Sequence, residues 1–317
     1  MMPLRTALVI SAALMSLSGC SGTALEEQAP ETGQAEVVQP ISTPAARPAP
    51  VSTPSPSPSP TPPPGPTTFV FDGELTQGGW IRGQAPGGTV TATLGSQTLT
   101  LDDGGHFFAA FDRDAGSTET LVARLSDGRR IESPIAISPR TWDIERVNVA
   151  KRPSGSSEAW WKRREPEYNA IVAARAMETG ATGWRQDFIW PVTGRISGRF
   201  GRQRIYRGEP GSYHSGIDIA GGNGTPFVAP ADGVVTLATT QPFSLEGYLL
   251  IIDHGQGLNS AFLHMSKIAV RDGETVRQGQ YIGNIGASGR ATGPHLHWGL
   301  KWRDARLDPL LFTGPMR

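Results

Sequence analysis

Glycine and proline recur so often in this chain that only short segments of regular structure fit between them. The 317 residues include 39 glycines and 27 prolines. From Phe69 to about Ser138, segments such as "TVTATLG" and "FVFDGEL" alternate apolar and polar side chains and are separated by Asp-Gly and Gly-Gly turns, and segments such as "GYLLIIDHG" further along also read as strands. This alternation predicts strands, and the turn spacing leaves little room for long helices. The predicted fold class is therefore all-β, with a C-terminal β-sheet domain preceded by a small antiparallel β-sandwich and a short helical connector.

Changes in composition divide the chain into five predicted parts. They are a leader at 1–20, a Pro/Ser/Thr-rich disordered tether at 21–67, a small β-sandwich domain at 68–139, a connector at 140–187 and a sheet domain at 188–317. The tether lacks aromatic residues and cannot bury a core. One helix is expected in the connector, from Pro166 to about Glu178, because proline suits a helix start and Gly180 a helix end.

The N-terminus has the pattern of a secretory leader. Arg5 precedes an apolar run from Ala7 to Leu17, which is too short for an ordinary transmembrane helix. The run ends in "LSGC", which resembles the bacterial lipobox and implies lipid on Cys20, the single cysteine. Since Ser21 follows, the resemblance implies anchoring on the periplasmic side of a Gram-negative outer membrane. The alternative is a plain signal peptide that happens to contain a cysteine.

Charge and motif content exclude two functional classes. The formal net charge is zero and the sequence pI is about 7, so no basic excess exists to bind a nucleic-acid backbone. The chain also lacks the HExxH arrangement, which excludes a zincin as the template.

Four of the six histidines fall in three motifs of the C-terminal part. "ATGPHLHWGL" carries His295 and His297, which a strand places on one face. Two imidazoles on one face suit a metal site, an acid/base site or both, and the alternative is a polar strand face. "SYHSGIDIA" adds His214 and Asp218, and "FLH" adds His264.

The remaining two histidines are predicted to have structural roles. His254 lies in "DHGQG", which predicts a turn between two strands, and His106 lies beside the "DDGG" turn. No second metal-binding type of residue recurs in register with His106.

Together these motifs resemble the lysostaphin-type zinc metallopeptidases, the LytM or M23 family, over about 190–309. The resemblance implies a LytM-like β-sheet peptidase domain. It implies that one Zn²⁺ is held by His214, Asp218 and His297, and that His264 and His295 are catalytic residues outside the ligand set. Three protein ligands leave the open position that a catalytic zinc needs. His254 would lie outside the zinc shell.

The function implied is hydrolysis of the peptide cross-links of bacterial peptidoglycan by attack of zinc-bound water. The implied partners are peptidoglycan stem peptides, the membrane through the N-terminal lipid, and other cell-wall hydrolases or regulators. A second hypothesis is a catalytically silent LytM-like module that binds and activates cell-wall amidases. A third places the function in the sandwich domain, as a carbohydrate or protein binder.

Overall fold

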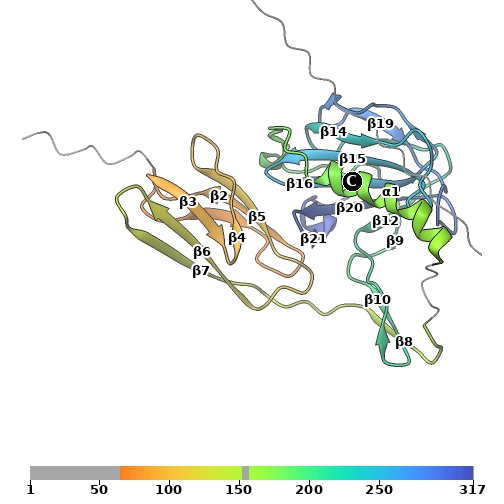
Figure 1. Cartoon of the computed structure of the whole chain (residues 1–317), viewed down its shortest axis with the longest axis horizontal. Helices are drawn as coiled ribbons and strands as arrows, with labels where there is room; N and C mark the ends of the chain where they lie inside the picture. The colour runs from red at the N-terminus through yellow and green to blue at the C-terminus, as the bar shows by residue number, and fades with distance from the viewer. Residues whose placement is uncertain (1–64, 152–156, 317) are drawn as a thin grey trace, which may run out of the picture. The chain divides into compact units, whose positions relative to one another are not determined.

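The computed structural model describes residues 65–151 and 157–316 (Figure 1). The leader, Cys20 and nearly all of the expected tether lie outside these residues. The described part is built mainly of strands with one α-helix, as the all-β prediction requires. No helix among the described residues has the length and apolarity needed to cross a membrane.

Two small antiparallel sheets form the part nearer the N-terminus. One has the order β1-β2-β5, and the other has the order β4-β3-β6-β7. Their strands are β1 (Val70–Gly73), β2 (Trp80–Gln84), β3 (Thr89–Leu94), β4 (Gln97–Thr98), β5 (His106–Ala110), β6 (Thr118–Leu125) and β7 (Arg130–Ala136). Their buried side chains include Ile81, Phe107 and Leu121, which are fully enclosed. His106 begins β5 and is exposed, with its ring 3.2 Å from Asp102 Oδ1.

The largest sheet carries the C-terminal histidine motifs. Its order is β18-β14-β15-β16-β20-β12-β9, with β21 paired to β20. The strands are β9 (Ile196–Gly198), β12 (Ile217–Ala220), β14 (Gly233–Ala238), β15 (Tyr248–Gly255), β16 (Leu258–Met265), β18 (Thr275–Val276), β20 (His295–Trp302) and β21 (Ala305–Leu307). Along β20 successive side chains alternate between faces, and Leu296, Trp298 and Leu300 are buried on the face opposite His295 and His297.

Two three-stranded sheets and two short 3-10 helices complete the described residues. One sheet has the order β11-β10-β8, from β8 (Ile144–Val147), β10 (Gln203–Tyr206) and β11 (Glu209–Pro210). The other has the order β13-β19-β17, from β13 (Pro226–Val228), β17 (Lys267–Ile268) and β19 (Tyr281–Asn284). The 3-10 helices are η1 (Gly183–Arg185) and η2 (Pro309–Leu311).

The helix α1 (Glu158–Arg175) begins earlier than its sequence predicted. Ser157 caps its start by accepting a hydrogen bond from the Trp160 backbone N–H, so Pro166 lies inside the helix rather than at its first turn. The predicted start was therefore wrong. Ser157 followed by Glu158 is a good N-cap signal, and it outweighs the loss of one backbone donor at Pro166.

α1 packs against β14 and β15 of the large sheet. Its underside meets a small apolar cluster that includes Ala174, Leu249 and Ile251. Arg164 fastens it with a two-pronged ion pair, in which Nη1 and Nη2 donate to the two carboxylate oxygens of Glu246 at 2.6 and 2.7 Å. Such paired bonds combine geometric specificity with charge, so α1 has a defined position on the sheet.

His254 is not in a turn, as predicted, but at the buried end of β15. Its Nδ1 lies 2.7 Å from the Asp232 carbonyl, which only accepts, so Nδ1 carries the proton. Its Nε2 then accepts from the Ser260 hydroxyl at 2.7 Å, while Trp298 Nε1 donates to the same hydroxyl oxygen. The chain of donors and acceptors is complete only while His254 is neutral.

This network predicts a pH dependence of stability. Burial lowers the pKa of His254 from its ordinary 6.5 to about 4, against smaller opposing effects from Asp232 and Asp253. The unfolded chain therefore binds a proton between about pH 6.5 and 4 that the folded chain does not. The contribution of His254 to the free energy of unfolding is complete above pH 6.5 and falls by about 3 kcal/mol as the pH drops to 4.

The measurement is urea unfolding from pH 4 to 7 with chelator present, for the wild type and His254→Gln. The variant is expected to be less stable at pH 7 but to lose less stability toward pH 4. His106→Gln is the control, because His106 is exposed. Parallel pH profiles for the wild type and His254→Gln would contradict the assignment.

Candidate metal and catalytic site

The site begins with the register between β12 and β20. In this antiparallel pair Asp218 lies directly opposite His297, so their side chains project from one face as cross-strand neighbours. β16 pairs on the other side of β20, with Leu263 opposite His297 and His264 one position further. Alternation alone would turn His264 to the other face, but its left-handed φ breaks the alternation, and His214 lies in the segment just before β12. Residues from three distant motifs are thereby brought together.

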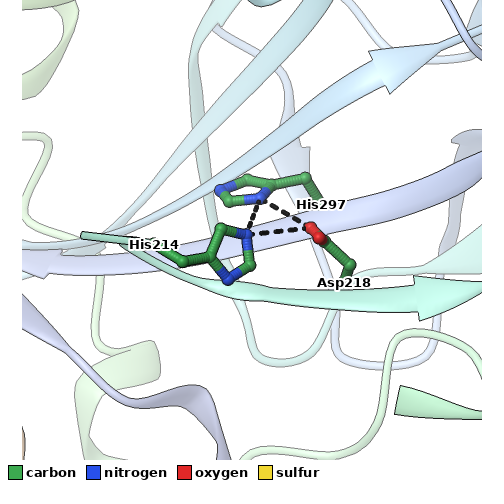
Figure 2. Close-up of side chains that lie close together, drawn as sticks. All are labelled: His214, Asp218 and His297. Atoms are coloured by element: carbon green, nitrogen blue, oxygen red, sulfur yellow. Dashed lines mark hydrogen bonds and ion pairs between the residues drawn. The ribbon is translucent and has the colours of Figure 1, made fainter. Parts of the chain in front are cut away.

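His214, Asp218 and His297 converge on a single point (Figure 2). The distance from His214 Nε2 to Asp218 Oδ1 is 3.0 Å, from His297 Nδ1 to the same oxygen 2.9 Å, and between the two nitrogens 3.1 Å. Zinc bonds of 2.0–2.1 Å in a tetrahedral site place ligand atoms about 3.4 Å apart. The observed triangle is close to that size.

The protonation pattern of His214 also suits a cation. Its Nδ1 lies 3.0 Å from the Arg199 carbonyl, and since a carbonyl only accepts, the Nδ1–H donates there. Its Nε2 faces Asp218 and His297. A proton on this nitrogen donates to the Asp218 carboxylate, and its loss leaves the lone pair that a metal ion accepts. A metal-binding histidine is typically oriented in this way by a bond from its other nitrogen.

Asp218 provides the negative charge of the group. Burial raises the pKa of this carboxyl, but the bonds from His214 and His297 outweigh burial and hold the pKa well below its usual range. Conversely, burial disfavours protonation of His214, but Asp218 outweighs it and raises the pKa of the imidazole. The site stabilises positive charge between its three side chains, whether the charge is a proton or a metal ion.

Two glycines allow the backbone to approach these side chains closely. A Cβ at Gly216 would stand 2.9 Å from His297 Nε2 and would overlap the Trp298 carbonyl. A Cβ at Gly198, on β9 beside Asp218, would overlap the Asp218 carboxylate and stand 3.1 Å from His214 Cε1. The donor set and this close packing fit a small tetrahedral cation such as Zn²⁺.

His264 and His295 lie beside this triangle. Their ring centroids are 5.0 Å apart, and His264 is 6.3 Å from the ring of His297. His264 Nδ1 lies 2.8 Å from the Ser288 carbonyl, and His295 Nδ1 lies 2.8 Å from the Gly293 carbonyl. Both rings therefore carry the proton on Nδ1, which leaves the lone pair on Nε2. His295 Nε2 is 3.6 Å from Asp218 Oδ1.

The backbone at His264 is strained. Its φ of 63° lies in the left-handed region, which costs a residue with a side chain about 1–2 kcal/mol. The surrounding hydrogen bonds hold it, since the His264 amide donates to the Glu246 carbonyl at 2.8 Å. Burial also lowers the pKa of the His264 imidazole. Strain of this kind concentrates at functional positions, and here it turns the ring toward His295.

The structure brings together all five residues singled out from the C-terminal motifs and leaves His106 and His254 apart from them. It also adds groups that sequence reasoning missed, namely the backbone carbonyls of Arg199, Ser288 and Gly293 and the two close glycines. Every residue carries a carbonyl, so no residue type signals this role. Only the glycines are recognisable by residue type, Gly216 in "HSGID" and Gly198 in "ISGRF".

Comparison with known proteins agrees with this geometry. Residues 212–309 match the Peptidase family M23. Peptidoglycan DD-endopeptidase ShyA of Vibrio cholerae is 38% identical over 126 residues, which cover 38% of this chain and 28% of that protein. A lipoprotein NlpD/LppB homolog of Pseudomonas aeruginosa is 35% identical over 132 residues, which cover 41% of this chain and 39% of that protein. The chain spans about a quarter to a third of the length of the endopeptidase relatives it matches.

A solved structure of a peptidase M23 protein from Pseudomonas aeruginosa superposes with a TM-score of 0.56 at 28% identity. The match covers 75% of this chain and 95% of that one. The likeness thus reaches well beyond the region that carries the histidine motifs.

The convergent triangle predicts one Zn²⁺ per chain, bound through three side chains. His214→Ala, Asp218→Ala and His297→Ala should each abolish stoichiometric zinc, because loss of one of only three ligands exceeds the 10–100-fold effect of removing an outer hydrogen-bond partner. The measurement is metal analysis of purified protein after dialysis. His106→Ala is the control and should keep the wild-type zinc content. Full zinc occupancy in all three variants would refute the ligand set.

Proposed function

The region that carries the site is a domain of peptidase family M23, and we propose from this premise that the chain is a zinc-dependent endopeptidase that hydrolyses peptide cross-links of peptidoglycan. The observation that carries the proposal is the convergence of His214, Asp218 and His297, with two further imidazoles whose Nε2 atoms are free. The relatives named as peptidoglycan DD-endopeptidases support the substrate class.

In this proposal His214, Asp218 and His297 would hold the metal. A bound zinc ion supplies Lewis acidity, which activates water at neutral pH and polarises a peptide carbonyl. Two neutral imidazoles and one carboxylate leave a net positive charge on the ion.

His264 and His295 perform the proton transfers and stabilise developing charge. Each Nδ1 donates to a carbonyl, so each Nε2 accepts a proton from the attacking water or, once protonated, donates to the oxyanion or to the leaving amine. The lowered pKa of His264 keeps that ring neutral, and therefore able to act as a base, at physiological pH. The two rings are 5.0 Å apart, close enough to act on one substrate carbon.

The alternative is a catalytically silent module that binds and activates cell-wall amidases. Such a role requires no metal and no free imidazoles. The presence of a full donor triangle and of the strained His264 backbone favours the enzyme. Zinc analysis together with digestion of purified sacculi separates the two.

We also propose that Cys20 carries lipid and that the chain is anchored in the envelope on the periplasmic side, with the outer membrane as the expected location. The "LSGC" sequence and the likeness to a protein named as a lipoprotein support this. The 21–67 segment would serve as the tether and 188–317 as the peptidase domain, with the sandwich at 68–139 and the connector between them.

Replacing either His264 or His295, the two histidines outside the ligand set, should lower the catalytic rate without loss of the metal. His264→Ala and His295→Ala are expected to keep zinc but to lower the initial rate of muropeptide release by at least about 10²-fold, the usual contribution of a general acid–base or oxyanion group. The double variant should be little slower than either single variant if the pair acts as a unit. His106→Ala serves as the matched control. Near-wild-type rates in both single variants would rule out this mechanism.

Lipid anchoring is tested independently of activity. The wild-type chain should partition with membranes, because stable anchoring needs more than one acyl chain and a bacterial lipoprotein carries several. Cys20→Ser removes the site of lipid attachment and should give an unprocessed or freely soluble form. The readouts are membrane fractionation and mass spectrometry of the N-terminus. A wild-type protein that is soluble in the periplasm with an unmodified N-terminus would overturn the anchor.

A further inference from the structure

A groove extends from the candidate metal site along the exposed face of β20. On this face His297 is followed by Gly299 and Lys301, and β16 places Ala261 opposite Gly299 in the same register. The groove has a volume of about 630 Å³, and both His297 and Lys301 line it. Of the five site residues only His297 lines the groove, so the groove meets the site at this side chain.

The other wall of the groove is α1. Arg164, Tyr168, Ile171 and Arg175 line it, and their spacing of three or four residues places them on one face of the helix. At the first end, the charge of Arg164 is balanced by Glu246 and Glu167. The middle is apolar, and Arg175 lies at the far end.

The far end of the groove holds an excess of positive charge from Arg175, Lys301 and Arg306. Within the part of the chain that the structure describes, the buried Nε of Arg175 has no hydrogen-bond partner. The ammonium of Lys301 is 3.4 Å from Asp304, whose side chain is almost completely exposed and so is a weak partner. Arg306 lies over the ring of Tyr213, 5.3 Å from its centroid.

The carboxylates along the groove do not neutralise this end. Glu246 favours the charged form of Arg175, but both of its carboxylate oxygens are already bonded to Arg164, and burial and the charge of Arg306 outweigh it. Glu178 and Asp304 are exposed at the rim. The cations thus face a groove without a matching buried anion among the described residues.

Each of these cations disfavours the charged form of its neighbour. Burial and the charge of Arg306 lower the pKa of Arg175 to about 10. Burial and the charge of Arg175 lower the pKa of Lys301. A guanidinium that is desolvated, short of partners and close to other cations is stabilised when an anion enters.

We propose that Arg175 and Lys301 bind a carboxylate of the peptide substrate, and that the groove between α1 and β20 is the channel along which this part of the substrate lies. The inference rests on the proposed function, because it assigns the occupant as part of the same substrate. A planar guanidinium fork beside an ammonium suits a carboxylate, and the groove leads directly to His297.

The geometry also sets the distance between the recognised carboxylate and the bond that is cleaved. Lys301 is four residues from His297 along β20, which at about 3.3 Å per residue is about 13 Å. An extended peptide has nearly the same rise, so the recognised carboxylate is about four residues along the substrate from the bond that is cut. The ligand class is therefore an extended peptide with an acidic group at a fixed spacing.

The experiment compares two substrates with the purified full chain. Cross-linked muropeptide dimers are used in the native form and after conversion of their carboxyl groups to amides with carbodiimide and ammonia. The wild type should prefer the native dimer by about 10-fold or more in kcat/KM, mainly through KM, since charge-assisted bonds of this kind are among the stronger polar contacts.

Arg175→Met and Lys301→Met should reduce that preference to near unity while leaving the rate on amidated dimer close to wild type. The rate on amidated dimer also shows that the variants are folded. Lys162→Met, on the exposed side of α1, removes the same charge outside the groove and should keep the preference. A wild type that does not discriminate, or groove variants that still do, would overturn the inference.

Failure of the proposed function is distinguishable from failure of the inference. If the chain cleaves neither dimer, binding of each dimer is measured by calorimetry in place of cleavage rates, which is possible because the peptide is not consumed. Binding that depends on the carboxylates and on Arg175 then supports the groove while the enzymatic proposal fails. Cleavage of both dimers at equal efficiency supports the enzyme and refutes the carboxylate site.

Discussion

The pairing of β12 with β20 is the constraint on which the site depends. Asp218 faces His297 only in the observed register, and a slip by one residue would send one of them to the opposite face of the sheet. The register is held from behind, where Ile217, Ile219, Leu296 and Trp298 are fully buried. The same alternation that builds the hydrophobic core therefore aims the polar side chains. A change of a core residue on these strands acts on the site through this register.

Sequence patterns predicted the strand that carries His295 and His297 because alternation is a local property. They also predicted that a single face would carry both imidazoles, which β20 displays with Leu296 buried between them. The start of α1 was misplaced, because Pro166 resembles a helix start while the true start is set by Ser157, whose capping bond is equally local but less conspicuous. His254 was placed in a turn because "HGQG" contains one, although the turn begins only after Gly255.

Other parts of the site depend on contacts between distant segments and left no local signal. The carbonyls that orient His214, His264 and His295 belong to the backbone, which is chemically the same at every position. The bond between Arg164 and Glu246 joins residues 82 positions apart. Lys301 is a polar residue in an alternating strand, and only the folded chain brings it near Arg175. Such features become visible when the tertiary structure gives each side chain its neighbours.

Because of the placement of α1, the side-chain cluster beside Asp218 and the wall of the groove come from different segments of the chain. The side chains that converge beside Asp218 come from β20 of the large sheet and from the segment just before β12. One wall of the groove comes instead from a helix that precedes them in sequence and is held by Arg164 and a small apolar cluster. Tyr168 and Val172 on that wall are about half exposed and support no core. Substitutions there leave the strands in place, so the lining of the groove can diverge among descendants of this chain while the cluster beside Asp218 stays the same. A helix exchanged between two such proteins would carry its groove wall with it.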